Sequence, residues 1–264
     1  MKISIIIPVY NAEKTIISTL NSVAYQSYKD FNIIIVNDGS KDSSIEIIEN
    51  YIRIHSDLDI KIISQENQGV SKARNVGLKM ACGDWIALLD SDDKWLANKL
   101  ERQMQILVEN PNIDFLGANR IGEYYSFFLN TKFGVLTRLR AKVLLFKNFF
   151  PTSTVIFKKS IIEEIGLFDE NQKHCEDVNY FIKISNCKEC YLLNEGLIMT
   201  GDGNIHYKEK GLSSNLWAMQ KGELTNLNFA YNAKIITILD YFIILNFSFL
   251  KYLRRVLLVK INKF

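Results

Sequence analysis

The chain is poor in cysteine, and its few cysteines show no disulfide framework. They are Cys82, Cys175, Cys187 and Cys190, in a chain of 264 residues. Cys187 and Cys190 form a Cys-x-x-Cys pair, but the sequence lacks a second pair at zinc-finger spacing and a thioredoxin-like context around this one. We therefore expect reduced thiols that are structural or incidental.

The sequence also lacks a targeting segment and a strong charge excess. The apolar run at residues 5–7 is too short for a signal peptide and no small-residue cleavage site follows it, which predicts a cytoplasmic protein. The net charge of +3 is too small to indicate a nucleic acid partner. With 48% hydrophobic and 23% charged residues, the chain is expected to form one large globular domain with a C-terminal tail.

Strand-like runs of Ile and Val alternate with segments of helical period through the first half of the chain. This alternation predicts an α/β fold with a mostly parallel sheet covered by helices. The expected strands are 4–9, 32–36, 60–64 and 85–89, and the expected helices are 16–24, 43–52, 70–81 and 94–109.

Beyond residue 111 the pattern is less regular. Residues 121–150 have no clean period, and we expect loop and helix there, lining a substrate site. The remaining expected elements are short strands at 114–118, 154–157 and 191–198 and short helices at 161–165 and 176–184.

The most distinctive segment is an apolar strand that ends in three carboxylates, Asp90, Asp92 and Asp93. Carboxylates this close repel one another unless a cation lies among them. They suit Mg²⁺ or Mn²⁺, which also takes ligands from a substrate phosphate. A solvated acidic turn that caps the next helix would carry the same residues, so the cluster alone leaves both interpretations open.

Polar residues also follow the other predicted strands, and the carboxyl ends of parallel strands share one edge of the sheet. Asn11 follows the first strand and is expected to cap the next helix, while Asp38 follows the second. The loop 65–69 leads into the helix that carries Arg74. Together these loops offer acceptors for a base, a helix amino end and a cation for phosphate, and carboxylates for a metal. They predict a nucleotide-diphosphate site without a Gly-x-x-x-x-Gly-Lys or Gly-x-Gly-x-x-Gly loop.

Four motifs, in this order, resemble those of the family 2 inverting glycosyltransferases of the GT-A fold. They are Ile5-Ile6-Ile7-Pro8-Val9-Tyr10-Asn11, Val36-Asn37-Asp38-Gly39-Ser40, Asn67-Gln68-Gly69 with Ala73-Arg74-Asn75-x-Gly77, and Asp90-Ser91-Asp92-Asp93. Further on, residues 166–170 and Glu176-Asp177 resemble the acceptor-side segment of that family. The resemblance implies a GT-A catalytic domain over 1–210, with a nucleotide-sugar half at 1–110 and an acceptor half at 111–210.

The resemblance also implies a role for each matched residue on the donor side. Pro8, Tyr10 and Asp38 would hold the nucleotide base and ribose. Asp90 would lie near the ribose and sugar, and Arg74 near the diphosphate or sugar. The residues expected to bind the nucleotide sugar are thus Pro8, Tyr10, Asp38, Arg74, Asp90 and Ser91.

Metal and catalytic roles follow from the same resemblance. Asp92 would bind the Mn²⁺ or Mg²⁺ ion that bridges the donor diphosphate, and Asp93 would cap a helix or support its neighbours. Asp177 would be the catalytic base with Glu176 beside it, although such a pair also suits any helix amino terminus. His206 is a candidate metal ligand, with a surface or hydrogen-bonded histidine as the alternative.

The implied activity is metal-dependent, inverting transfer from a nucleotide-diphospho-sugar, expected to be a UDP-sugar, to a saccharide. The expected acceptor is a lipid-linked glycan in O-antigen, capsule or lipooligosaccharide assembly. A sugar-1-phosphate nucleotidyltransferase is one alternative, but it normally has a Gly-rich loop where this chain has Pro8-Val9-Tyr10-Asn11. A non-catalytic nucleotide-sugar-binding subunit is the other.

The tail, 211–264, is expected to form an amphipathic helical region. Lys251, Arg254 and Arg255 follow helical spacing and give a basic stripe beside an apolar one. Such a helix can lie on the inner face of an anionic membrane, and a helix packed on the catalytic domain fits equally well.

Overall fold

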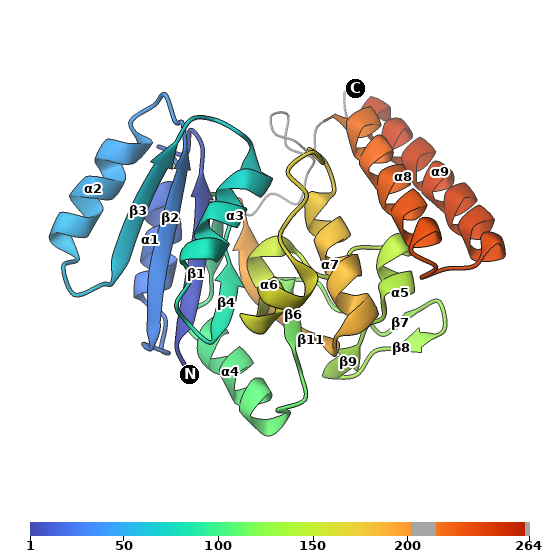
Figure 1. The fold of residues 1–264 in the computed structure, drawn as a ribbon, viewed down its shortest axis with the longest axis horizontal. Helices are drawn as coiled ribbons and strands as arrows, with labels where there is room; N and C mark the ends of the chain where they lie inside the picture. Colours follow the sequence, from blue (N-terminus) through green and yellow to red (C-terminus); the bar gives the residue numbers. More distant parts are fainter. Residues whose placement is uncertain (202–214, 262–264) are drawn as a thin grey trace.

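A computed structural model describes residues 1–201 and 215–261 and confirms the α/β fold (Figure 1). Within these residues, nine strands form one mixed sheet in the order β3-β2-β1-β4-β10-β6-β11-β5, with β9 paired to β11. The strands are β1 (Ile3–Val9), β2 (Phe31–Asp38), β3 (Ile60–Gln65), β4 (Trp85–Leu88), β5 (Asp93–Trp95), β6 (Phe115–Arg120), β9 (Leu136–Arg138), β10 (Ile156–Lys158) and β11 (Cys190–Thr200).

The first four strands are parallel, as the alternation of strands and helices predicts. β1 pairs with β2 on one side and β4 on the other, and β2 pairs with β3. Every residue of β1 and β2 is buried, which requires cover on both faces of the sheet. β10 then runs antiparallel to β4 and β6.

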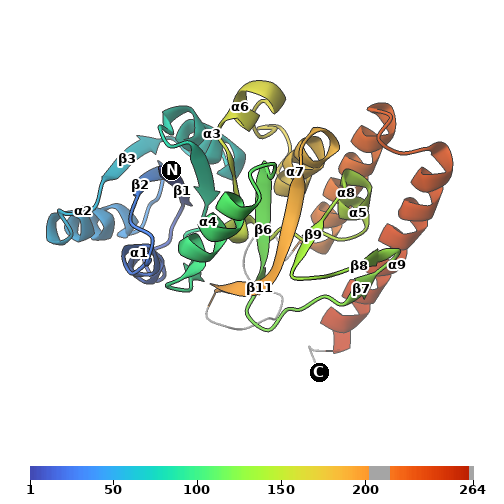
Figure 2. The same ribbon diagram turned by 90° about the horizontal axis from the view of Figure 1, so that it is seen from below.

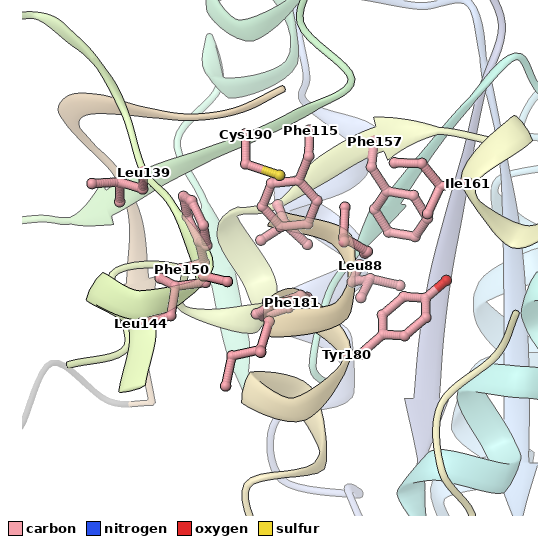
Figure 3. Close-up of a cluster of buried hydrophobic side chains, with 14 of the residues drawn as sticks. Leu88, Phe115, Leu139, Leu144, Phe150, Phe157, Ile161, Tyr180, Phe181 and Cys190 are labelled. Carbon is pink, nitrogen blue, oxygen red and sulfur yellow. The ribbon is translucent and has the colours of Figure 1, made fainter. Parts of the chain in front are cut away.

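Helices cover both faces of the sheet. They are α1 (Ile16–Ala24), α2 (Ser44–Ile54), α3 (Val70–Met80), α4 (Lys99–Glu109), α5 (Ala141–Phe146), α6 (Ser160–Ile165), α7 (Glu176–Cys187), α8 (Leu216–Asn232) and α9 (Ile238–Ile261). The side chains of β1 alternate between two cores: Ile5 and Ile7 pack with α1, α2 and α4, whereas Ile6 packs with α3 and α7. The second core is rich in aromatic rings, and the ring of Phe115 packs against those of Phe150, Phe157 and Phe181 (Figure 3).

One helix boundary was wrong for a reason that lies elsewhere in the chain. The helix expected from residue 94 begins only at Lys99, because residues 93–95 form β5 against Ile198–Thr200 of β11. The helix expected over 70–81 is α3, which ends at Met80. Gly83, after this helix, passes so close to β1 that an added Cβ would lie 2.7 Å from the carbonyl oxygen of Lys2.

Residues 121–150 form more regular structure than expected. The hairpin β7 (Phe127–Phe128) with β8 (Thr131–Lys132) is followed by β9, which pairs with β11, and by α5. Phe133, Phe149 and Phe150 from this segment are buried in the aromatic core. The pairing of β9 is made with residues far away in sequence, so the segment's own period does not reveal it.

The tail forms a helical hairpin of α8 and α9 at the end of the molecule opposite α2 and β3 (Figures 1 and 2). In its buried face, Glu223 of α8 pairs with Lys251 at 3.0 Å and Arg255 at 2.5 Å. Two residues of the expected basic stripe therefore face inward. Among the described residues, no helix has both the length and the hydrophobicity to cross a bilayer.

The outer face of α9 is mostly apolar. Its exposed large hydrophobic side chains are Ile238, Leu239, Phe242, Ile243, Phe249, Leu250, Leu253 and Leu257. Asn246 and Arg254 are also exposed there. The expected basic stripe is thus divided, because Glu223 pairs with Lys251 and Arg255 on the inner side while Arg254 stays on the outer side.

Candidate functional site

The carboxyl ends of β1, β2 and β4 lie at one edge of the sheet and carry the residues expected on the nucleotide side. Tyr10 follows β1 and is 52% exposed, which leaves its ring free to contact a ligand. Asn11 accepts a hydrogen bond from the Lys41 amide at 2.8 Å and donates its own amide to Ser40 at 3.1 Å. It therefore ties two loops together, and the expectation that Asn11 caps α1 was wrong. Pro8 lies beyond Ile6, the last residue of β1 paired to β4.

Asp38 is a buried carboxylate that organises the loop after β3. Its Oδ1 accepts hydrogen bonds from the Gln65 side chain at 2.7 Å and the Gln68 amide at 2.9 Å, and its Oδ2 accepts one from the Gly69 amide at 2.9 Å. A cavity of about 490 Å³ lies beside it, lined by Gly39, Lys41, Ser64, Gln65, Glu66 and Asn67. Its size is within the range of small-molecule sites.

Arg74 lies at the centre of the site and joins its two halves. The guanidinium is buried and donates to Asp90 Oδ1 at 2.8 Å and to Glu176 Oε1 at 3.0 Å. It also lies over the ring of Phe168, 5.5 Å from the centroid. Burial disfavours the charge, but Asp90 and Glu176 outweigh this effect and raise the pKa of Arg74 above its usual range. The ion pair thus holds together carboxylates from β4 and α7.

Two further side chains of α3 clamp the acceptor-side segment. Asn75 donates to the Phe168 carbonyl and accepts from the Phe168 amide, both at 2.9 Å. Lys72 and Asn75 both bind the Glu170 carboxylate at 2.9 Å. Gly77 allows the helix to approach β1, since a Cβ there would lie 2.5 Å from Ile6. The motif around Arg74 therefore builds the contact between the halves.

The acidic cluster after β4 is partly buried. Asp93 accepts a hydrogen bond from Ser153 Oγ at 2.5 Å and from the Gly201 amide at 3.1 Å. It is part of β5, so the role of helix cap expected for Asp93 was wrong. Asp90 and Asp92 are half-buried, and the Ser91 carbonyl accepts a hydrogen bond from Thr19 at 2.9 Å. Burial, and then repulsion from Asp90 and Asp92, raises the pKa of Asp93 to about 7.

This cluster fits a divalent cation whose coordination a substrate completes. Beyond the effect of burial, Asp90 and Asp92 repel the charged form of Asp93; a cation would relieve this repulsion, and carboxylate oxygens are hard ligands. Over residues 1–201 and 215–261, no three His, Cys, Asp or Glu side chains form a complete metal site. A Mg²⁺ or Mn²⁺ ion that takes several ligands from water and phosphate does not need one. His206, the other expected ligand, lies outside the described residues.

Glu176 and Asp177 begin α7, directly after a strained residue. Cys175 has a φ of 56°, a left-handed conformation that is uncommon for residues other than glycine. It turns the chain so that Glu176 meets Arg74. Asp177 Oδ2 accepts from Thr152 Oγ1 at 3.0 Å. Burial, and then Asp177, raises the pKa of Glu176 to about 7, although Arg74 opposes this change.

Sequence reasoning missed Thr152, which contacts Asp177, and Ser153, which contacts Asp93. They belong to a 3-10 turn, η1 (Thr152–Thr154), whose residues are all buried. The sequence contained one usable signal: three consecutive hydroxyl residues interrupt an apolar run from Phe149 to Phe157. Buried hydroxyls need partners, so such an interruption indicates a polar site nearby.

Comparisons with known proteins agree with this arrangement. The model of the family described as "Glycosyl transferase family 2" matches residues 4–166. WfgD of Escherichia coli, described as a UDP-Glc:alpha-D-GlcNAc-diphosphoundecaprenol beta-1,3-glucosyltransferase, is 31% identical over 251 residues, which cover 92% of each chain. GlyA of Streptococcus pneumoniae is 38% identical over 128 residues, but the match covers only 48% of this chain and 17% of GlyA.

Solved structures share the fold at lower identity. TarS of S. aureus in complex with UDP-GlcNAc aligns with a TM-score of 0.67 and 24% identity over 86% of this chain and 66% of that chain. The mannosyltransferase PcManGT of Pyrobaculum calidifontis, in complex with GDP-Man and Mn²⁺, aligns with a TM-score of 0.61 and 16% identity over 94% and 79% of the two chains. This likeness confirms the predicted GT-A fold.

The family match and the WfgD match each span well over half of this chain, and both agree with the strand-end motifs. The chain therefore belongs to glycosyl transferase family 2 and is a glycosyltransferase.

Proposed function

We propose that this enzyme transfers a sugar from a UDP-sugar to a saccharide linked to a lipid diphosphate, with inversion at the anomeric carbon and with a divalent metal ion. The observation that carries the proposal is the buried Arg74, which joins donor-side Asp90 to acceptor-side Glu176, next to Asp177. The donor and acceptor classes follow those in the name of WfgD, which resembles this chain over 92% of both lengths. Family membership favours this activity over the nucleotidyltransferase and binding-subunit alternatives.

In the proposed site, Tyr10, Pro8 and the loop held by Asp38 contact the nucleoside. Asp90 and Ser91 lie toward the ribose and sugar. Arg74 holds the carboxylates of Asp90 and Glu176 with its two terminal nitrogens, and in the proposed site it lies near the diphosphate or sugar. Asp92, within the cluster 90–93, would hold Mn²⁺ or Mg²⁺, which when bound neutralises charge on the leaving diphosphate.

Asp177 is the proposed base. The acceptor hydroxyl loses its proton to the Asp177 carboxylate while its oxygen forms a bond to the anomeric carbon. The bond from that carbon to the diphosphate oxygen breaks, and the nucleoside diphosphate leaves with the electron pair. A single displacement of this kind inverts the configuration, and general-base help contributes about 10²- to 10⁴-fold. Glu176 supports the site through Arg74.

We further propose contact with a membrane surface through the outer face of α9. Among its described side chains, that face is mostly apolar with one exposed cation, Arg254, and the only acid of α9, Asp240, pairs with Lys142 at 2.6 Å. A surface with apolar side chains and no free carboxylate suits a lipid interface, where a lipid-linked acceptor would reside. We also propose that residues 1–110 form the nucleotide-sugar half of the enzyme and residues 111–210 its acceptor half, followed by the tail.

The donor can be identified by thermal stabilisation. A ligand that binds only the folded state raises the unfolding temperature, so UDP-glucose, UDP-GlcNAc, UDP-galactose and GDP-mannose would each be tested with and without MnCl₂. At least one UDP-sugar should raise the Tm, and MnCl₂ should increase the rise. Asp92→Asn should remove the part that depends on MnCl₂. Absence of stabilisation by every UDP-sugar in the presence of metal would contradict the proposal.

A further inference from the structure

The turn η1 (Thr152–Thr154) places three hydroxyl groups in the interior of the protein. Thr152 is 8% exposed, and Ser153 and Thr154 are fully buried. Apolar residues flank the turn on both sides, from Phe149–Phe150 to Val155–Phe157. A buried hydroxyl is costly unless it is hydrogen-bonded. The partners of these groups therefore indicate what the turn does.

Thr152 faces the acceptor side of the site. Its Oγ1 donates to Asp177 Oδ2 at 3.0 Å, and the amide of Val178 donates to Asp177 Oδ1 at 2.7 Å. Both carboxylate oxygens are thereby fixed in position. A carboxylate has about four acceptor sites, so these two bonds leave room for a substrate hydroxyl.

Ser153 faces the donor side. Its Oγ donates to Asp93 Oδ2 at 2.5 Å and accepts from the Asp90 amide at 3.1 Å. Its carbonyl accepts from the indole of Trp95 at 2.7 Å. One residue thus holds the acidic loop after β4 at three points.

The turn itself is held firmly. Thr154 donates its hydroxyl to the Pro151 carbonyl at 2.7 Å, and Gln103 donates to the Thr154 carbonyl at 2.9 Å. The Leu88 amide donates to the Val155 carbonyl at 3.3 Å, which joins the turn to β4. Thr152 and Ser153 of one fixed turn thus contact Asp177 and Asp93, which lie far apart in sequence.

We propose that this turn is a positioning element for glycosyl transfer: Thr152 orients the Asp177 carboxylate, and Ser153 fixes the donor-side loop that carries Asp90 to Asp93. The inference rests on the proposed function, because it takes Asp177 as the base and the loop as part of the donor site. A fixed spacing between base and donor matters because a misplacement of 1 Å can lower the rate about 10²-fold.

Substitutions of Thr152 and Ser153 should change different kinetic constants. Thr152→Val keeps the shape of the side chain and removes the hydroxyl, so kcat should fall about 10- to 100-fold while the KM for the nucleotide sugar stays within about twofold. Ser153→Ala should mainly weaken donor binding, with a rise in donor KM and a smaller metal-dependent thermal stabilisation. Thr152→Ser retains the hydroxyl and should recover most of the lost kcat.

The experiment compares these variants with Thr225→Val, a matched control at an exposed position on α8. All would be assayed with the nucleotide sugar that best stabilises the wild-type protein, and the Tm of each would be recorded. If Thr152→Val does not fold, Thr152→Ala takes its place. A kcat for Thr152→Val within twofold of wild type, or a loss of kcat that Thr152→Ser does not recover, would overturn the positioning role of Thr152.

Asp177→Asn separates this inference from the proposed function. If Asp177→Asn loses transfer but Thr152→Val does not, the base assignment stands and the turn has no positioning role. If Asp177→Asn transfers at the wild-type rate, the base assignment fails, and with it the role of Thr152.

Discussion

At the scale of single residues, Arg74 is the most consequential side chain of the site. It is buried between two carboxylates that lie 16 and 102 positions away in the sequence. Arg74 and Glu176 are buried and Asp90 is half-buried, and their charges are tolerated only while they remain paired, because an isolated buried ion costs several kcal/mol. The arrangement therefore indicates a specific requirement for this geometry. General stabilisation would be achieved as well by apolar residues.

Removing Arg74 should destabilise the fold strongly. Arg74→Met leaves Glu176 buried without its cation, and we expect the free energy of unfolding to fall by about 3–5 kcal/mol. Urea unfolding followed by circular dichroism measures this change. The double variant Arg74→Met with Glu176→Gln should recover much of it, because the remaining carboxylate, Asp90, is only half-buried and can be hydrated. A loss below about 1 kcal/mol in the single variant would show that the ion pair is not needed for stability.

The residue-level roles were only partly predictable from sequence. Asp38, Arg74 and Asp90 stood out because each follows a strand or begins a helix within a motif. The partners of Arg74 could not be inferred, since Glu176 comes from a helix 102 positions away. Thr152 and Ser153 belong to no motif, and only their burial in the folded chain reveals what they contact.

At the scale of elements, the sequence predicted the strands and helices of the first half of the chain well. β1 to β4 and α1 to α3 lie close to their expected ranges because each shows a short strand-like run or a one-sided helical pattern. β5 was missed because three residues become a strand only by pairing with β11. The inward position of Lys251 and Arg255 could not be predicted from α9 alone, because their partner Glu223 lies on another helix.

The exposed apolar side chains of α9 lead to a test of membrane contact. Replacing Leu239, Phe242, Leu250 and Leu253 by serine should reduce the fraction of protein that sediments with phosphatidylethanolamine–phosphatidylglycerol vesicles several-fold, because apolar insertion drives such binding. Binding should depend only weakly on salt, since Lys251 and Arg255 face Glu223 and Arg254 is the one exposed cation among the described side chains of α9. Truncation is a poorer test, because Ile244 and Ser248 of α9 are buried against the rest of the protein.

The matched control for α9 replaces Ile54 and Val108 by serine. These side chains are 77% and 65% exposed and lie on α2 and α4. This control should bind vesicles like the wild type. If the α9 variant also binds like the wild type, the outer face of α9 is not a membrane contact.

At the scale of the whole molecule, the buried acids make stability depend on pH. Burial, and then Asp177, raises the pKa of Glu176 from its ordinary 4.5 to about 7. Between these values the unfolded chain has released this proton and the folded protein still holds it. Because the folded state binds more protons, stability falls as pH rises through this window and levels off above it.

Glu176→Gln should remove its share of this dependence. As the pH rises from about 4.5, the ordinary pKa of this carboxyl, to about 7, its pKa in the folded protein, we expect the Tm of the wild type to fall relative to the Tm of the variant. The scans should be made in EDTA, so that metal binding at the neighbouring acidic cluster does not contribute. A difference that stays constant across this range would show that Glu176 titrates at its ordinary pKa.

The central claim is tested most directly by the product of the reaction and its dependence on Asp177. Wild-type enzyme and Asp177→Asn would be incubated with UDP-glucose, MnCl₂ and GlcNAc-α-diphospholipid, and the new anomeric signal would be recorded by NMR. We predict a β-linked product from the wild type, and a rate about 10²- to 10⁴-fold lower for Asp177→Asn with donor binding retained. An α-linked product, or a wild-type rate in the variant, would contradict the proposed mechanism.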